Sequence, residues 1–190
     1  MLKTLFPALR MLLVLTILTG VVYPLVITLV SQSLFPEQAN GSLIHAGETV
    51  VGSALIGQNM NSDPRYFWSR PSAVSYNPLP SGGSNLAPTS ATLQASIVER
   101  ADTFITANGM TDAIGLVPAE MLFASGSGLD PHISPEAARL QVGRVAVERN
   151  LPREQVAALV EQFVEPPQFG FLGQSRVNVL LLNLALDELE

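Results

Sequence analysis

The sequence contains no cysteine. A disulfide framework, a thiol nucleophile and a metal site with thiolate ligands are therefore excluded. Histidine is nearly as scarce, because His45 and His132 are the only two, and a metal site usually needs three or four converging ligands. We therefore expect no metal site. The 190 residues are still enough for one ordinary domain to bury a hydrophobic core without crosslinks.

Basic residues are also few, with 10 Lys and Arg against 16 Asp and Glu. Lys3 and Arg10 are the only charged residues before Glu37, so the rest of the chain holds 8 basic and 16 acidic residues, a formal charge of −8. Nucleic-acid binding requires a basic surface, and anionic lipid headgroups attract basic residues. We therefore expect neither nucleic acid nor an anionic lipid surface as a partner of this acidic part.

A long apolar run is present near the N-terminus. Residues 11–34 contain no charge, and as a helix they would measure about 36 Å, enough to cross a hydrocarbon core of about 30 Å. Because Lys3 and Arg10 precede the run, the positive-inside rule places residues 1–10 in the cytoplasm and residues 35–190 outside it. The sequence thus predicts a single-pass membrane protein.

A cleaved signal peptide is the alternative interpretation of the same run, because it also combines a basic start with an apolar segment. The run is longer than the apolar core of a usual signal peptide, and the residues that follow it offer no A-x-A-like cleavage site. An uncleaved anchor is the preferred interpretation.

Two small residues lie four positions apart inside the predicted span. Thr16 and Gly20 form a small-xxx-small pair, which lets a second helix approach closely. Pro24 lies about midway and should kink the helix and free a carbonyl for a neighbour. We predict a helix-packing face at Thr16 and Gly20. The alternative is that Gly and Pro are simply more frequent in membrane helices.

The remaining residues predict one α+β domain. Ser134-Pro135-Glu136 is a strong helix start, with a serine cap, proline at the first helical position and then an acid. The first expected elements are two strands joined at Ala46-Gly47 over 40–56, an irregular stretch over 57–89, and a helix capped by Thr89 or Ser90 that runs to Asn108. A short strand or helical turn over 117–123 follows, and then a helix from Pro135 to about Arg149 and a helix from Pro152 until Pro166 ends it. The tail over 177–189 fits a strand, a helix or a strand passing into a helix.

The irregular stretch is rich in Pro and Gly turn signals. A stretch of this length in a compact domain is usually functional or disordered. Its four aromatic residues favour an ordered loop; they are Tyr66, Phe67, Trp68 and Tyr76.

One segment collects the residue types of a serine hydrolase. Ser127, Asp130 and His132 lie within six residues, and hydrolysis would need the histidine against the serine. The nucleophile-elbow pattern G-x-S-x-G is absent, because Ser125 precedes Ser127 by two and Leu129 follows it by two. Glycines that shape a turn, with Gly128 among them, are the better explanation, and we expect no catalytic residue here.

A second segment, Ser81-Gly82-Gly83-Ser84, is rich in glycine, which lets backbone amides approach a phosphate. It lacks the lysine of a P-loop and does not visibly join a strand to a helix. It echoes the LSGGQ signature of ATP-binding-cassette proteins, with Pro80 inserted. These four residues are the candidate nucleotide-binding site.

Several segments stand in a fixed order behind the predicted anchor. They are Gly52–Gln58, Tyr66–Ser72, Ser81–Leu86, Ala124–Pro135, Gly170–Gly173, and Val177–Leu180 with Leu182–Asp187. Together they closely resemble the C subunit of the Kdp-type high-affinity potassium-transporting ATPase of bacteria. The resemblance runs from the anchor to Asp187. The most specific part is the nine-residue string that begins at Ser127 and contains Gly128, Asp130 and His132.

The resemblance implies an accessory, non-catalytic subunit in the bacterial inner membrane. Its implied partners are a potassium-translocating A subunit, an ATP-hydrolysing B subunit of the P-type class and a small F subunit. It also implies a role in assembly and activity, as a catalytic chaperone that raises the ATP affinity of the B subunit and itself binds nucleotide. No cofactor is expected to bind tightly.

Two implications of the resemblance need comment. Ala87 follows the glycine-rich segment where the family more often has glycine. ATP is cytoplasmic, whereas the charge pattern places the domain outside, so ATP binding is an implied attribute without a located site. An anchored serine hydrolase and a module that captures an extracytoplasmic ligand are the alternatives from other functional classes.

Overall fold

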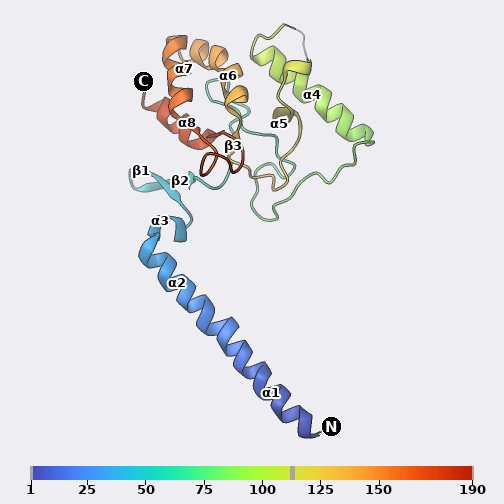
Figure 1. Cartoon of the computed structure of the whole chain (residues 1–190). Helices are drawn as coiled ribbons and strands as arrows, with labels where there is room; N and C mark the ends of the chain where they lie inside the picture. The colour runs from blue at the N-terminus through green and yellow to red at the C-terminus, as the bar shows by residue number, and fades with distance from the viewer. Residues whose placement is uncertain (1, 112–113, 190) are drawn as a thin grey trace. The chain divides into compact units, whose positions relative to one another are not determined.

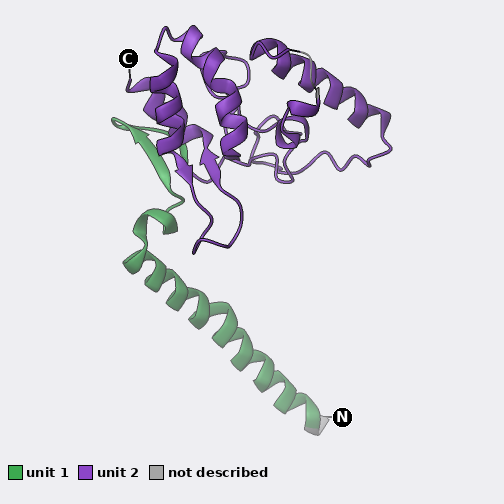
Figure 2. Ribbon diagram, turned by 45° about the horizontal axis from the view of Figure 1, so that its top comes forward, with its two compact units in different colours: residues 1–53 green, residues 54–190 purple. Residues whose placement is uncertain are grey.

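The computed structural model describes residues 2–111 and 114–189. The chain divides into two compact units, residues 1–53 and residues 54–190 (Figure 2). The part predicted as one domain over 35–190 therefore contributes its first 19 residues to the same unit as the anchor helix.

The first unit is dominated by one long apolar helix. It consists of α1 (Leu2–Ile17), a π-helical turn (Leu18–Val22) and α2 (Tyr23–Leu34), and the short α3 (Pro36–Ala39) follows (Figure 1). Thr4–Leu34, 31 residues, is long and apolar enough to cross a membrane. The helix begins well before Met11, so most of the predicted cytoplasmic segment 1–10 continues the same helix.

The π-helical turn lies immediately before Pro24. In an α-helix, Pro24 would have to donate to the Gly20 carbonyl, which its ring nitrogen cannot do. The structure widens the turn, and the Tyr23 amide donates to the Leu18 carbonyl five residues back. Such bulges are a common way to accommodate a disrupted ladder. The structure thus has a π-helical turn immediately before Pro24, and the predicted kink stays a prediction.

A two-stranded antiparallel sheet completes this unit. β1 (Leu43–Ala46) and β2 (Thr49–Ser53) pair with Ala46 opposite Thr49, and the register shifts between Ile44 and His45. Gly47 takes φ +62° in the connecting turn, a conformation that glycine adopts without steric cost. The predicted hairpin is confirmed, with its turn at Gly47 and Glu48.

The second unit groups its helices around one core. The helices are α4 (Ala91–Ala107), a 3₁₀ turn (Ile114–Leu116), α5 (Ala119–Leu122), α6 (Pro135–Glu148), α7 (Arg153–Gln162) and α8 (Val179–Asp187). α6, α7 and α8 pack together, and α4 packs against α5 (Figure 1). Fully buried side chains include Phe67, Val145, Val156, Leu182 and Leu186.

Three very short strands form the sheet of this unit, in the order β3-β5-β4. β3 (His132–Ile133) and β4 (Val164–Glu165) pair antiparallel with opposite edges of β5 (Arg176–Asn178). β5 passes directly into α8. Asn178 is the last residue of the strand and also caps the helix, since its side chain accepts from the Leu181 amide at 3.2 Å. The tail is thus a strand passing into a helix, one of the three predicted possibilities.

The predicted helix starts are confirmed at two serine caps. Ser90 Oγ accepts from Leu93 N–H and Ser134 Oγ from Ala137 N–H, which satisfies amides that have no partner within the helix. The predicted end of α7 is wrong, because the helix ends at Gln162 instead of reaching Pro166. Val164 and Glu165 turn away to pair with β5, and this long-range pairing outweighs local helical periodicity.

Candidate functional site

Two residues of the irregular stretch are bound through both backbone polar groups by side-chain amides. Asn183 of α8 accepts from Phe67 N–H at 2.8 Å and donates to Phe67 C=O at 3.0 Å. Gln141 of α6 accepts from Trp68 N–H at 2.7 Å and donates to Trp68 C=O at 3.3 Å. Both amides are buried, so they replace the strand partner that this irregular segment lacks.

The next residue is held in the same way from within the stretch. Asn61 Oδ1 accepts from Ser69 N–H at 2.8 Å, and Asn61 Nδ2 donates to Ser69 C=O at 3.2 Å. Tyr76 donates its hydroxyl proton to the Arg70 carbonyl, and burial raises the pKa of that hydroxyl. The residues around 61–76 are therefore an ordered loop, as their aromatic content predicted.

Arg144 of α6 fixes the same loop from another side. Its Nη1 donates to the carbonyls of Pro64 and, at 2.9 Å, Tyr66, and its Nε donates to Asn108 Oδ1 at 3.1 Å. The guanidinium also lies 4.3 Å from the ring centroid of Trp68, a cation–π contact. Burial lowers the pKa of Arg144 to about 10, so the side chain remains charged at neutral pH.

The segment Ala124–Pro135, which carries the most specific part of the resemblance, packs against two other segments that contain glycine. We call the contact the glycine hub; its glycines are Gly57, Gly82, Gly83, Gly126 and Gly128. The Gly57 amide donates to the Leu129 carbonyl at 2.8 Å, and the Gly82 amide donates to the Ser127 carbonyl at 2.9 Å. Three segments distant in sequence are thereby joined backbone to backbone.

The hub leaves no room for a side chain at Gly57 or Gly128. A Cβ atom on Gly57 would lie 2.5 Å from the Asp130 carbonyl oxygen. A Cβ on Gly128 would lie 2.5 Å from Val74 Cγ2 and 2.8 Å from the Gly82 carbonyl oxygen, and its φ of +69° is itself unfavourable for other residues. Close packing therefore explains Gly57 and Gly128, whereas an added Cβ on Gly82 or Gly126 would meet no atom within 4 Å.

Ser127, Asp130 and His132, the residues of the alternative hydrolase interpretation, are not arranged as a catalytic triad. Ser127 Oγ accepts from Leu129 N–H at 3.1 Å, and no hydrogen bond joins it to His132 in the described part of the chain. Asp130 pairs instead with Arg70, with Nη1 2.8 Å from Oδ2. The other carboxylate oxygen, Oδ1, accepts from His132 N–H at 3.0 Å. These contacts build a turn, as the sequence favoured.

The carboxylate of Asp130 is held in its charged form. Partial burial raises its pKa, but the hydrogen bonds from His132 and Arg70 outweigh burial and lower the pKa to about 2. The ion pair therefore persists over the physiological pH range.

The candidate nucleotide-binding residues Ser81–Ser84 form one of the three segments that meet in the glycine hub. The Gly82 amide is used by Ser127, and Gly83 packs on Gly126, whose carbonyl oxygen would lie 3.2 Å from an added Cβ. A phosphate loop needs amides that point at the ligand, followed by a helix N-terminus. The Gly82 amide is already engaged by the Ser127 carbonyl, and ATP binding at Ser81–Ser84 stays a prediction.

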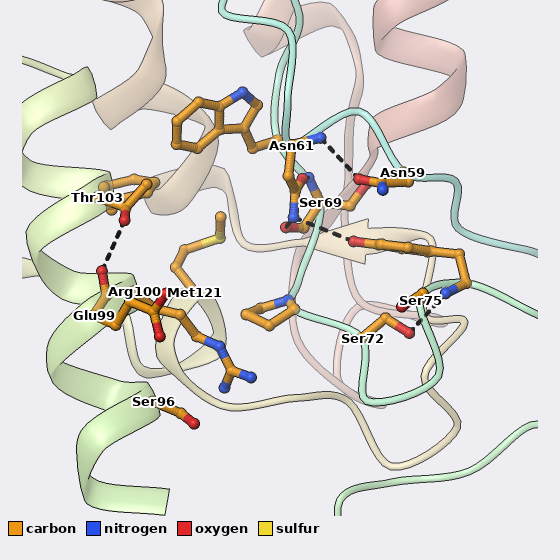
Figure 3. A pocket seen from close by; sticks show the side chains of 14 residues that line it. Asn59, Asn61, Ser69, Ser72, Ser75, Ser96, Glu99, Arg100, Thr103 and Met121 are labelled. Carbon is orange, nitrogen blue, oxygen red and sulfur yellow. Dashed lines mark hydrogen bonds between the residues drawn. The ribbon is translucent and has the colours of Figure 1, made fainter. Parts of the chain in front are cut away.

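A cavity of about 420 Å³ lies between α4 and the loop of residues 59–76 (Figure 3). Hydroxyl and amide side chains dominate its lining; they are Asn59, Asn61, Ser69, Ser72, Ser75, Tyr76, Ser96 and Thr103. Arg100 is the cation in this lining, and it donates to the Leu122 carbonyl at 2.7 Å beside the carboxylate of Glu99. With one cation beside an acidic residue, the lining lacks the several positive charges that usually bind a triphosphate.

The predicted packing residues of the anchor lie on the exposed helix. Thr16 and Gly20 are exposed, and no heavy atom comes within 4 Å of a Cβ built on Gly20. Thr19 Oγ1 donates to the Leu15 carbonyl at 2.7 Å, so its polar group is satisfied inside the helix. The face is open to a second helix, and its use remains a prediction.

Sequence reasoning did not single out the residues that hold the irregular stretch. They are Asn61, Gln141, Arg144 and Asn183. Gln141 and Arg144 occupy apolar-facing positions of α6, where a polar residue is unusual. A polar residue at such a position is the feature of the sequence that could have pointed to Gln141 and Arg144.

Comparison with known proteins covers nearly the whole chain. Residues 5–188 match the family described as "KdpC: K+-transporting ATPase, c chain". Three relatives each carry the name "Potassium-transporting ATPase KdpC subunit". The protein of Gemmatimonas aurantiaca is 53% identical over 192 residues, covering 100% of this chain and 94% of the relative.

The other two relatives are equally similar. The protein of Methylococcus capsulatus is 54% identical over 186 residues, covering 96% of each chain. That of Allorhizobium ampelinum is 55% identical over 190 residues, covering 98% of this chain and 97% of the relative.

Proposed function

The chain belongs to the KdpC family, the c chain of the K+-transporting ATPase, and we propose that it is a non-catalytic accessory subunit of an ATP-driven, high-affinity potassium uptake pump. The observation that carries the proposal is the extent of the match, which spans residues 5–188 and so includes both the apolar helix and the second unit. The chain thus matches the family as a whole subunit.

The geometry of the motif segment supports an accessory role. In the most specific part of the resemblance, Ser127 to His132, the polar groups form hydrogen bonds with the backbone and the ion pair between Asp130 and Arg70. A segment of this kind shapes a rigid surface for other subunits. We propose that the chain stabilises the assembled pump.

We propose three protein partners, the potassium-translocating A subunit, the ATP-hydrolysing B subunit of the P-type class and the small F subunit. The apolar helix supplies contacts within the membrane, with Thr16 and Gly20 as the packing face. The second unit supplies contacts outside the lipid.

The proposed topology has the N-terminus in the cytoplasm and the second unit outside. Support comes from Lys3 and Arg10, the only charged residues before the uncharged part of the helix. A reporter fused after residue 190 should be active only outside the cytoplasm. A reporter that is active only inside would reverse this topology.

We propose that the effect on ATP, the chaperone role, is transmitted through contacts with the B subunit. An extracytoplasmic domain has no access to cytoplasmic ATP, and the Gly82 amide of the glycine-rich segment already donates to the Ser127 carbonyl. The chain then needs no nucleotide site of its own to raise the ATP affinity of the pump.

Co-purification tests the proposed function. The full chain, tagged at its C-terminus and extracted with a mild detergent, should bring down large multi-span proteins that peptide identification assigns to a potassium pump. Recovery of the chain alone, from cells that make the other pump subunits, would contradict the proposal.

A further inference from the structure

An apolar hairpin tip projects from the second unit between β4 and β5. We call residues 166–175 the hairpin tip. Its base is closed by the pairing of Glu165 with Arg176, whose Nε lies 2.8 Å from Glu165 Oε2. Pro166 and Pro167 enter the tip and restrict its backbone.

The tip is ordered by its own backbone hydrogen bonds. Gln168 and Leu172 exchange two, at 3.0 Å and 2.9 Å, and the Gly170 amide donates to the Pro167 carbonyl at 3.0 Å. Phe169 adopts φ +54°, a conformation that is uncommon for an aromatic residue. These backbone contacts define the path of the loop from which Phe169, Phe171 and Leu172 extend.

Three large apolar side chains on this tip are left in solvent. Phe169 is 87% exposed, Phe171 80% and Leu172 55%. Single exposed apolar residues are common on protein surfaces. Three together on a rigid loop form a patch of the kind that marks an interaction site.

The composition of the tip favours a protein partner over a lipid surface. Residues 166–175 contain no charge, and Arg176 at the base is engaged by Glu165. Loops that bind membranes commonly add Lys, Arg, Trp or Tyr for the headgroup region, and none lies within the tip. Rigid aromatic anchors are instead typical of protein interfaces, because little conformational entropy is lost when they are buried.

We propose that the hairpin tip is a docking element that inserts Phe169 and Phe171 into an apolar pocket on another protein subunit of the potassium pump. The inference rests on the proposed function, because it requires that the chain assembles with other subunits. It adds which element makes the contact and what chemistry the partner offers there, an uncharged apolar pocket.

A photo-crosslinking experiment on the full complex tests this assignment. Benzoylphenylalanine is introduced in place of Phe171, and in a control in place of Val147, an apolar residue on α6 that is 75% exposed. Irradiation of membranes that contain the assembled pump should join the chain to another pump subunit at position 171 and much less at position 147. Crosslinks to lipid alone, or none in an assembled complex, would overturn the proposal.

A substitution series separates docking from folding and from the proposed function. Phe169→Ser with Phe171→Ser should reduce recovery of the other subunits several-fold, whereas Val147→Ser should leave it unchanged. Trp68 fluorescence should report unaltered unfolding in both variants, because the tip lies outside the core. If the wild-type chain and the double variant assemble equally well, the tip is not a docking element, whereas the proposed function is unaffected. If the wild-type chain brings down no partner, the proposed function itself fails.

Discussion

The side-chain amide of Asn183 binds both backbone polar groups of Phe67, a residue 116 positions earlier in the chain. Both residues are buried, so water does not compete for these groups. The contact secures an irregular segment to α8 without any strand. Together with the pair of Gln141 and Trp68, it explains how a stretch without helix or strand lies in the core.

Asn183→Leu should destabilise the second unit strongly. Two buried backbone groups of Phe67 would lose their partners, and each such loss costs about 1–3 kcal/mol. We expect the free energy of unfolding to fall by about 2–4 kcal/mol. The fluorescence of Trp68, the single tryptophan of the chain, reports the transition for the detergent-solubilised chain. Gln174→Leu at an exposed position is the control, and equal stability of the two variants would show that the amide contact is unimportant.

Gly128→Ala should disrupt the glycine hub. The new Cβ would clash with Val74 and the Gly82 carbonyl, and φ +69° is unfavourable for alanine. A strained backbone position of this kind costs about 1–3 kcal/mol, measured by the same fluorescence transition. Gly126→Ala is a matched control two residues away, because its Cβ would meet no atom within 4 Å. A loss in the control as large as in Gly128→Ala would contradict the packing explanation.

Local signals predicted much of this fold, because helix starts depend on adjacent residues. Ser90 and Ser134 cap their helices as their sequence contexts indicate. The glycine hub could not be located in this way. Its contacts join Gly57, Gly82 and Ser127, and nothing local specifies that these segments meet. The two-residue strands β3 and β4 are too short to show a period and exist only through pairing with β5.

Asp130→Asn should remove part of the acid sensitivity of the second unit. The folded-state pKa of Asp130 is about 2, below its ordinary value of 3.8. A lowered pKa stabilises the fold above the unfolded-state pKa, and this contribution is lost as the pH falls through 4 towards 2. Wild type should exceed the variant in stability by about 1–2 kcal/mol at pH 6.

The two curves should converge near pH 2, where Asp130 of the wild type becomes protonated. Urea titrations of the detergent-solubilised chain, followed by Trp68 fluorescence at pH 6 and near pH 2, measure both differences. Asp63, whose pKa is also lowered to about 2, is present in both proteins and cancels from the comparison. A constant offset between the curves would show that Asp130 is not responsible for the acid sensitivity.

Gly20→Leu should weaken assembly within the membrane. The substitution fills the open face beside Thr16 and keeps a second helix at a distance. The measured quantity is the recovery of other pump subunits with the tagged chain in detergent. Val26→Leu, beyond Pro24 on the same helix, is the control. Undiminished recovery with Gly20→Leu would show that Thr16 and Gly20 make no close contact.

The most direct test of the accessory-subunit assignment is the potassium-stimulated ATPase activity of the pump with and without this chain. The remaining subunits are expressed in cells that lack the chain, and membranes are assayed over a range of ATP concentrations. The account predicts that activity falls to background, or that the KM for ATP rises, and that expression of the full chain restores both. Full activity with an unchanged KM for ATP in the absence of the chain would contradict the account.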